Sequence, residues 1–281
     1  MEKYCYLNGK ILETKNAKVS IADIGILRGF GVFDYLRTYN GKPFLFEEHV
    51  DRFEKSAILS GLRVPISRTE IKNIIASLLK KNNVKDAGIR MALTGGESDD
   101  GLDWNAKTPT FFILIQALHA YDMKMYEKGA SLITSEFQRE NPGAKTNNYL
   151  TRIKLSPKLL KKKAQEVLYI KDGIVLEGAT CNIFAFVGNS LITPKDDILL
   201  GTRRALVIGL AKKYFKVRER QLTKKELENA DEAFITSTTR DIMPVTKIDD
   251  KKIGSGQVGD NTKKLMELYQ AYIQYQLQKY K

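Results

Sequence analysis

The chain contains 281 residues, 43% of them hydrophobic, and carries a formal net charge of +13 at pH 7. This length suits two modest domains with ordinary buried cores and excludes a single small domain. No apolar run is long enough to span a bilayer, and the first residues lack the apolar segment of a signal peptide. We therefore expect neither a membrane-spanning nor an exported protein.

Two hairpins are expected near the start of the chain. Each turns at an Asn-Gly pair between apolar segments, a pattern that favours a tight β-turn. The expected hairpins pair residues 4–7 with 11–12 and residues 32–39 with 43–46. Strands at residues 88–94 and 110–117 follow, joined by a polar loop at residues 95–101 that we expect to be flexible.

Two helices are expected between the second hairpin and the strand at residues 88–94. Residues 47–62 have helical apolar spacing. Their predicted buried face consists of Val50, Phe53, Ala57 and Ile58. Ser67 and Glu70 form a capping-box pattern that begins a second helix, which we expect to continue through Leu79.

The chain is predicted to divide into two domains. Residues 1–118 indicate a small α+β domain, and an interdomain linker is expected at residues 119–126, where an apolar strand gives way to polar residues. Residues 127–281 would form a larger, sheet-rich domain, because strand and turn signals recur between helical segments. The strands expected there are 130–134, 167–170, 174–176, 183–187, 191–192 and 233–237. The expected helices are an irregular one after Lys145 near Pro157, one at 202–215, one capped by Thr223 and Glu226, and one at 263–280.

Two residues in the second half point to chemistry. Lys145 follows a Pro-Gly turn and is expected near a helix start, where the helix dipole and other cations would lower its pKa. A lysine of lowered pKa can form a Schiff base with an aldehyde. Glu177 ends an expected strand, where a carboxylate could keep a ring nitrogen protonated, as pyridoxal phosphate enzymes require. Taken singly, Lys145 is more simply explained as a solvated surface lysine and Glu177 as part of a turn at a strand end. The occurrence of both in one chain favours a catalytic role.

The motifs around these residues resemble a known family. Lys145-x-x-Asn148-Tyr149-Leu150, then a helix and a hairpin, then Glu177-Gly178 before Asn182, closely resemble the class IV, fold-type IV pyridoxal phosphate aminotransferases. That family includes branched-chain aminotransferases, D-amino-acid aminotransferases and aminodeoxychorismate lyases. The resemblance extends along nearly the whole chain. It implies an α+β fold with a smaller N-terminal α/β sandwich and a larger C-terminal pseudo-barrel, pyridoxal 5'-phosphate as cofactor, and a homodimer.

The resemblance also implies roles for individual residues. Lys145 would be the catalytic Schiff-base lysine of the C-terminal domain, Glu177 the partner of the pyridine nitrogen, and Tyr149 the hydroxyl beside the phenolic oxygen. The other cofactor-binding residues that it implies are Arg52, Asn182, Gly201, Thr202, Thr238 and Thr239. The family motif Gly-Ile-Thr-Arg has Gly201 in place of its Ile here, so only a backbone contact would survive. Independently, Gly201 and Thr202 precede an expected helix whose amides could bind an anion.

The substrate residues are predicted from the first half of the chain. A substrate carboxylate favours a bidentate guanidinium, and Arg90 and Arg37 each lie in an expected strand. Burying the Arg90 guanidinium without a partner would cost free energy, which favours an anionic ligand for it. The alternative is that its strand lies at the edge of the sheet and that Arg90 faces water. Branched-chain enzymes have similar motifs at both places, which adds Phe33 and Tyr35 to the substrate residues. Tyr35 replaces a family glycine and could narrow the pocket, and Asp34 replaces a family glutamate.

We predict a transaminase that moves an amino group between a branched-chain or similar apolar amino acid and 2-oxoglutarate. The subfamily stays open, because the spacing of Lys145 and Asn148 is closer to that of D-amino-acid aminotransferases and aminodeoxychorismate lyases. Cys181 also stands where branched-chain enzymes commonly have glutamate. The alternative from another functional class is a basic nucleic-acid-binding module without catalytic activity. It predicts a colourless purified protein whose binding to DNA is sensitive to salt.

The numbers and positions of the cysteine, histidine and lysine residues limit which partners and which cellular location we expect. The two cysteines, Cys5 and Cys181, lie far apart, as is typical of a reduced, cytoplasmic protein. Two histidines and no cysteine pair at ligand spacing argue against a metal site. The basic clusters are scattered on expected helices with no interleaved aromatic residues. We interpret them as solvated faces and predict no nucleic acid and no membrane partner.

Overall fold

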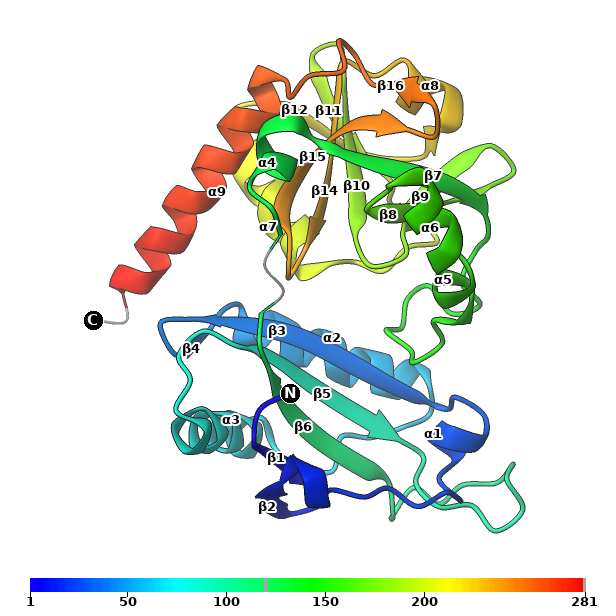
Figure 1. Cartoon of the computed structure of the whole chain (residues 1–281), viewed down its shortest axis with the longest axis vertical. Helices are drawn as coiled ribbons and strands as arrows, with labels where there is room; N and C mark the ends of the chain where they lie inside the picture. Colours follow the sequence, from blue (N-terminus) through cyan, green and yellow to red (C-terminus); the bar gives the residue numbers. More distant parts are fainter. Residues whose placement is uncertain (119–120, 280–281) are drawn as a thin grey trace. The chain divides into compact units, whose positions relative to one another are not determined.

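The structure is a computed structural model that describes residues 1–118 and 121–279 (Figure 1). It contains two compact units, Met1–His119 with Gly143–Asn148, and Ala120–Pro142 with Tyr149–Lys281. Within the described ranges, no helix is both long enough and apolar enough to cross a membrane.

The segment that carries Lys145 differs from the sequence-based division. Residues 143–148 were expected in the C-terminal domain, but they belong to the N-terminal unit. Residues 119 and 120 of the predicted linker lie outside the described residues, and helix α4 (Lys124–Lys128) begins within the last part of the predicted linker. The limits at 118 and 127 stay predictions.

The N-terminal unit is built on an antiparallel sheet of six strands within residues 1–118, in the order β2-β1-β6-β5-β3-β4. The strands are β1 (Tyr4–Leu7), β2 (Lys10–Glu13), β3 (Gly31–Tyr39), β4 (Lys42–Pro43), β5 (Gly88–Thr94) and β6 (Thr110–Gln116). Both expected hairpins are confirmed, and both Asn-Gly pairs have the positive φ values that such turns need. The return strand β4 ends at Pro43, earlier than expected, because helix α2 already begins at Phe46.

Helices α2 (Phe46–Leu59) and α3 (Arg68–Asn82) pack against this sheet in one hydrophobic core. The predicted capping box is confirmed, since the Ser67 hydroxyl accepts from the Glu70 amide and the Glu70 carboxylate accepts from the Ser67 amide. Ile58 was expected on the buried face of α2 but is 70% exposed. Each residue turns the helix by about 100°, so Ile58 rotates outward from its buried neighbour Ala57. A 3-10 turn (Thr14–Asn16) and helix α1 (Ile24–Leu27) were not predicted.

The C-terminal unit contains a mixed sheet of ten strands in the described residues, with β12-β11-β10-β14-β15-β7-β8-β9-β13 in order and β16 beside β15. The strands are β7 (Ala130–Glu136), β8 (Glu166–Lys171), β9 (Ile174–Gly178), β10 (Asn182–Val187), β11 (Ser190–Thr193), β12 (Lys216–Glu219), β13 (Leu222–Thr223), β14 (Glu232–Ser237), β15 (Asp241–Ile248) and β16 (Lys251–Lys252). The expected hairpins β8–β9 and β10–β11 are confirmed. Strand β15 was not predicted as a strand, since it contains Pro244, which removes a ladder donor.

The helices of this unit, besides α4, are α5 (Leu150–Lys154), α6 (Ser156–Lys162), α7 (Thr202–Ala211), α8 (Lys224–Glu228) and α9 (Asp260–Gln278). The break between α5 and α6 confirms the irregularity expected near Pro157. Helix α7 ends at Ala211, four residues before its expected end, and the capping box that begins α8 is confirmed.

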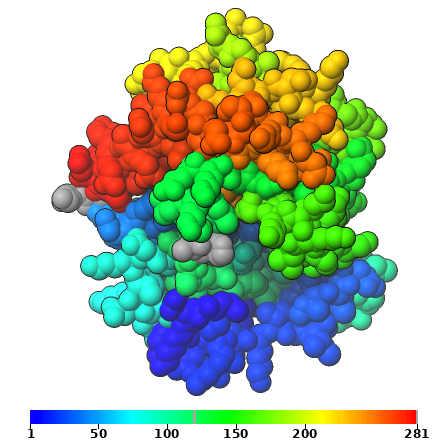
Figure 2. All heavy atoms as spheres, turned by 45° about the horizontal axis from the view of Figure 1, so that its top comes forward, coloured from blue at the N-terminus to red at the C-terminus, as the bar shows by residue number. Residues whose placement is uncertain are grey.

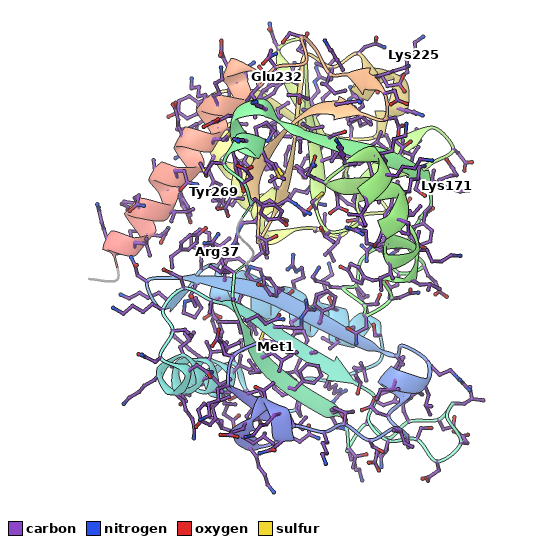
Figure 3. The ribbon with its side chains drawn as sticks, in the orientation of Figure 1. Met1, Arg37, Lys171, Lys225, Glu232 and Tyr269 are labelled. Atoms are coloured by element: carbon purple, nitrogen blue, oxygen red, sulfur yellow. The ribbon has the colours of Figure 1, made fainter. Side chains whose placement is uncertain are left out.

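The C-terminal helix α9 is fixed at both its start and its middle. Figure 2 shows it in red on the surface of this unit, and it packs on α7, β14 and β15. The Glu232 carboxylate accepts from the amide of Thr262 at 2.8 Å, and the Tyr269 hydroxyl donates to Asp241 at 3.0 Å (Figure 3). The predicted end at Tyr280 lies outside the described residues.

Candidate active site

The segment around Lys145 extends the N-terminal sheet. Thr146 forms a bridge with Val32, the Phe33 amide donates to the Lys145 carbonyl at 2.9 Å, and the Asn147 amide donates to Gly31 at 2.9 Å. These contacts lie along the edge of β3 that β5 does not occupy. Lys145 therefore has an extended main chain held against a strand of the N-terminal unit.

This placement corrects one sequence-based argument. Lys145 was expected close to a helix start, where the dipole would act on its amine. Helix α5 begins only at Leu150 and has five residues. Because the dipole effect is confined to the first turn, it does not reach Lys145.

Four predicted substrate residues lie on one face of the N-terminal sheet. They are Phe33, Tyr35 and Arg37, at alternate positions of β3, and Arg90, which pairs directly with Tyr35. Lys145 Nζ lies 4.6 Å from the centre of the Phe33 ring, so the lysine amine is on this face as well. We call Phe33, Tyr35, Arg37, Arg90 and Lys145 the lysine face.

Arg90 lies in the middle of this face. Its strand β5 is central, between β3 and β6, so the edge-strand alternative is wrong. The guanidinium lies 4.6 Å from the centre of the Phe33 ring and 5.6 Å from that of Tyr35, and Nε donates to Gln116 at 3.4 Å. The aromatic rings and Gln116 therefore fix the position of the guanidinium on this face. The Arg37 guanidinium instead lies 4.1 Å from the centre of the Tyr39 ring.

Tyr35 depends on a glycine in the neighbouring strand. A Cβ atom added to Gly88 would lie 1.7 Å from the Tyr35 hydroxyl, so the phenol ring occupies the space above that glycine. Tyr35 replaces a glycine of the resembled family, and Gly88 provides the room that the larger side chain needs.

The opposite face of β3 carries an ionic cluster. Asp34 is fully buried, and it accepts from Arg52 Nε at 2.7 Å, from Arg52 Nη2 at 2.9 Å and from His49 Nδ1 at 2.6 Å. Burial opposes ionisation, but Arg52 and His49 outweigh it and hold the Asp34 pKa well below its usual range. The predicted phosphate ligand Arg52 therefore has a carboxylate partner on two of its nitrogens, which leaves Nη1 for another acceptor.

The second group of predicted residues lies in the C-terminal unit, around Glu177. This carboxylate is 5% exposed. Oε1 accepts from Arg139 Nε at 2.8 Å and Nη2 at 2.6 Å, and Oε2 accepts from the Leu199 amide at 3.0 Å. Arg139 Nη2 also donates to the Pro142 carbonyl at 2.6 Å. Each of the two carboxylate oxygens is therefore held by a donor, one by a guanidinium and the other by a backbone amide.

Leu199 joins Glu177 to the start of α7. Its carbonyl accepts from the Asn182 side chain at 2.8 Å, while its amide donates to Glu177. Gly201 is the N-cap residue of α7, and a Cβ atom there would lie 2.2 Å from Asn182 Oδ1. A glycine is therefore required at 201, and its neighbour Thr202 is buried.

The turn after β14 carries the remaining predicted residues. Ser237 and Thr239 hydroxyls lie 3.4 Å apart, Thr238 lies between them, and α7 packs against β14. Thr236 pairs with Asn182 across β10 and β14. The Thr236 hydroxyl is buried and has no hydrogen-bond partner within residues 1–118 and 121–279. Tyr149 is the N-cap residue of α5 in this unit.

A buried ion cluster that the sequence did not predict lies near these turns. Glu166 is fully buried and lies 3.3 Å from Arg240 Nη1 and 3.4 Å from Arg152 Nε. Thr180 donates to Glu166 and accepts from Arg240 at 2.8 Å, so the β9–β10 and β14–β15 turns are tied together. Burial raises the pKa of the adjacent Cys181 thiol well above its ordinary value.

Sequence reasoning missed two residues that contact the predicted ones. Arg139 pairs with Glu177, and Ser56 contacts the Lys145 amide. Arg139 follows a strand and precedes a Pro-Gly turn, which is a common surface pattern. Only Ser56 left a signal, as a polar residue at i+4 from Arg52 on an otherwise apolar helix face.

Comparison with known proteins supplies a context for this arrangement. The family model described as "Amino-transferase class IV" matches residues 31–248. A putative branched-chain-amino-acid aminotransferase from Methanocaldococcus jannaschii is 38% identical, over 94% of this chain and 94% of the relative. A D-alanine aminotransferase from Staphylococcus epidermidis is 33% identical over 96% and 97%, and an aminodeoxychorismate lyase from Bacillus subtilis is 32% identical over 95% and 94%.

Solved structures are similar along the same length. The branched-chain amino acid aminotransferase of Escherichia coli has a TM-score of 0.88 and 28% identity, covering 95% of this chain and 93% of that chain. The branched-chain amino acid aminotransferase of T.th., solved with pyridoxamine 5'-phosphate, has a TM-score of 0.87 and 26% identity, covering 96% and 93%.

Proposed function

The chain belongs to the class IV aminotransferases, with their fold-type IV α+β architecture, and from this premise we propose that it is a pyridoxal phosphate enzyme acting on branched-chain or similar apolar amino acids with 2-oxoglutarate. The observation that carries the substrate class is the lysine face, where Arg90 stacks on Phe33 and Tyr35. A guanidinium there suits a carboxylate, and the aromatic rings suit an apolar side chain.

The donors of the C-terminal unit fit pyridoxal 5'-phosphate. The start of α7 offers amides without a side chain at Gly201, and the buried Thr236 hydroxyl lacks a partner among the described residues. Both features suit a phosphate. We infer that Arg52, Asn182, Gly201, Thr202, Thr238 and Thr239 hold the cofactor. Glu177 would accept from the pyridine N–H, and Tyr149 would contact the phenolic oxygen.

The bound cofactor would supply a ring that accepts electrons when a bond at the substrate Cα breaks. Lys145 Nζ would hold the cofactor at its aldehyde carbon. The Lys145 amine would move a proton between the substrate Cα and the cofactor C4′, as general base and acid. Glu177, which accepts from Arg139 and the Leu199 amide, would hold the proton on the ring nitrogen. Arg90 would orient the substrate carboxylate.

Arg90→Ala tests the substrate assignment. Loss of a charge-assisted bidentate contact costs roughly 2–4 kcal/mol, so kcat/KM for amino acid and keto acid alike should fall about 30- to 1000-fold. Cofactor binding should persist, because its proposed donors are untouched. The measurement is the half-reaction with L-leucine, followed by the visible absorbance of the bound cofactor.

Arg63→Ala is the matched control, since Arg63 is an exposed arginine of the same unit. Unchanged L-leucine kinetics in Arg90→Ala would remove Arg90 from the substrate site. A wild-type half-reaction with D-alanine but not L-leucine would replace the proposed substrate. Pyruvate release from aminodeoxychorismate without any amino-acid half-reaction would favour a lyase.

We also infer that the enzyme is a homodimer. Twofold symmetric dimers are the commonest assembly of soluble enzymes, and the resemblance implies one here. Sedimentation of the holoenzyme should give about twice the chain mass of 31.9 kDa. A monomer that retains full specific activity at assay concentration would contradict this assignment.

A further inference from the structure

Helix α2 carries a stripe of polar side chains on its buried side. His49, Arg52 and Ser56 are spaced i, i+3 and i+7, so they project from the same side of the helix. The rest of that side is apolar and packs in the core. The side chains of His49 and Arg52 form hydrogen bonds with Asp34, whereas Ser56 contacts a different part of the chain.

Ser56 joins α2 to the main chain of Lys145. The Ser56 side chain is fully buried, and its hydroxyl donates to the Arg52 carbonyl at 2.7 Å. The Lys145 amide donates to the same oxygen at 3.0 Å. Since the only proton of the hydroxyl is used by Arg52, the oxygen can serve Lys145 only as an acceptor, which is what the amide requires.

The Lys145 residue is therefore held on both sides. Its amide is fixed by Ser56, and its carbonyl accepts from the Phe33 amide at 2.9 Å. Between these two anchors lies the Cα atom from which the flexible lysine side chain starts, with Nζ over the Phe33 ring. A long side chain can reach one point reproducibly only if its Cα is fixed.

We propose that Ser56 is a positioning residue for Lys145, and this inference rests on the proposed role of the Lys145 amine in proton transfer. Its hydroxyl replaces a missing strand partner for the Lys145 amide and links that amide to the helix that also holds Arg52. Proton transfer is sensitive to such placement, because a shift of about 1 Å can cost about 10²-fold in rate.

Thr38 provides a matched control in the same unit. It is also fully buried, and its hydroxyl likewise bridges two main-chain groups, donating to the Lys85 carbonyl at 2.6 Å and accepting from the Ala87 amide at 2.8 Å. Five residues of extended strand, about 16 Å, separate it from Phe33. Removing either hydroxyl deletes an equivalent buried bridge, but only Ser56 touches Lys145.

The experiment compares Ser56→Ala, Ser56→Thr and Thr38→Val as holoenzymes. Amide exchange is read residue by residue by mass spectrometry, and kcat and KM are measured with an amino acid donor. In Ser56→Ala we expect at least 10-fold faster exchange at the Lys145 amide and a kcat about 10- to 100-fold lower, with KM unchanged because the lysine face keeps Arg90. Ser56→Thr, which keeps the hydroxyl, should restore both values. Thr38→Val should accelerate exchange at Ala87 and leave kcat within about twofold.

Two results would overturn the inference. One is unchanged exchange at Lys145 in Ser56→Ala; the other is an equal loss of kcat in Thr38→Val at equal loss of stability. If Ser56→Thr fails to fold, the comparison of Ser56→Ala with Thr38→Val still tests whether Ser56 positions Lys145. A wild-type protein without transaminase activity would remove the proposed function, whereas the exchange measurement tests the link between Ser56 and Lys145 independently.

Discussion

Lys145→Ala is expected to abolish turnover. The proposed amine both holds the cofactor and moves the substrate proton, and loss of proton transfer alone costs roughly 10²–10⁴-fold. The wild-type protein should be yellow as purified, with a visible band that borohydride bleaches, and the variant should lose that band. Steady-state transamination and absorbance spectra of the two proteins provide the measurement.

The fold of this variant should persist, because the anchors of Lys145 are main-chain groups that alanine retains. Lys154→Ala is a matched control, since Lys154 is an exposed lysine of helix α5. It should keep both colour and activity. Normal transamination by Lys145→Ala would remove this residue from the reaction.

Glu177→Gln is expected to have the next largest effect. The amide cannot hold the ring nitrogen protonated, so kcat should fall about 10²–10³-fold, as when a preorganised group is lost from a transition state. The substitution also leaves the partly buried Arg139 guanidinium without its buried carboxylate partner. Breaking one partner of a buried pair costs roughly 3–5 kcal/mol, which denaturant unfolding can measure.

Arg139→Gln combined with Glu177→Gln separates these two effects. Removing both partners should recover part of the lost stability, because no charge is left uncompensated. Turnover should stay low, because the carboxylate is still absent. Recovery of kcat in the double variant would show that Glu177 acts on stability rather than on the proposed cofactor nitrogen.

Local sequence determined much of the fold. The Asn-Gly pairs specified the first two hairpins, because few other residues accept the positive φ of such turns. Ser67 with Glu70 and Thr223 with Glu226 specified the starts of α3 and α8, because each box satisfies amides within four residues. Such signals involve residues that are close together in the chain, so they can be recognised from the sequence alone.

The residues of the candidate site were found from motifs, but their contacts were not. Lys145, Glu177 and Gly201 stand out because the type of residue and its neighbours match the chemistry of a known family. The sequence contains no signal that Arg139 pairs with Glu177, since 38 positions separate them. Short polar patterns identify which residues act, whereas long-range pairing decides which other residues hold them.

Tertiary structure alone decided where Lys145 belongs. By chain order it lies in the second half, and a helix start was expected beside it. The structure instead pairs residues 145–147 with the edge of β3 that β5 does not occupy, so that the amine shares a face with Phe33 and Arg90. The physical reason is that an unpaired strand edge and an extended segment each need hydrogen-bond partners. The sequence by itself determined the residue types and the turns, and only the packed sheet determined which of those residues meet.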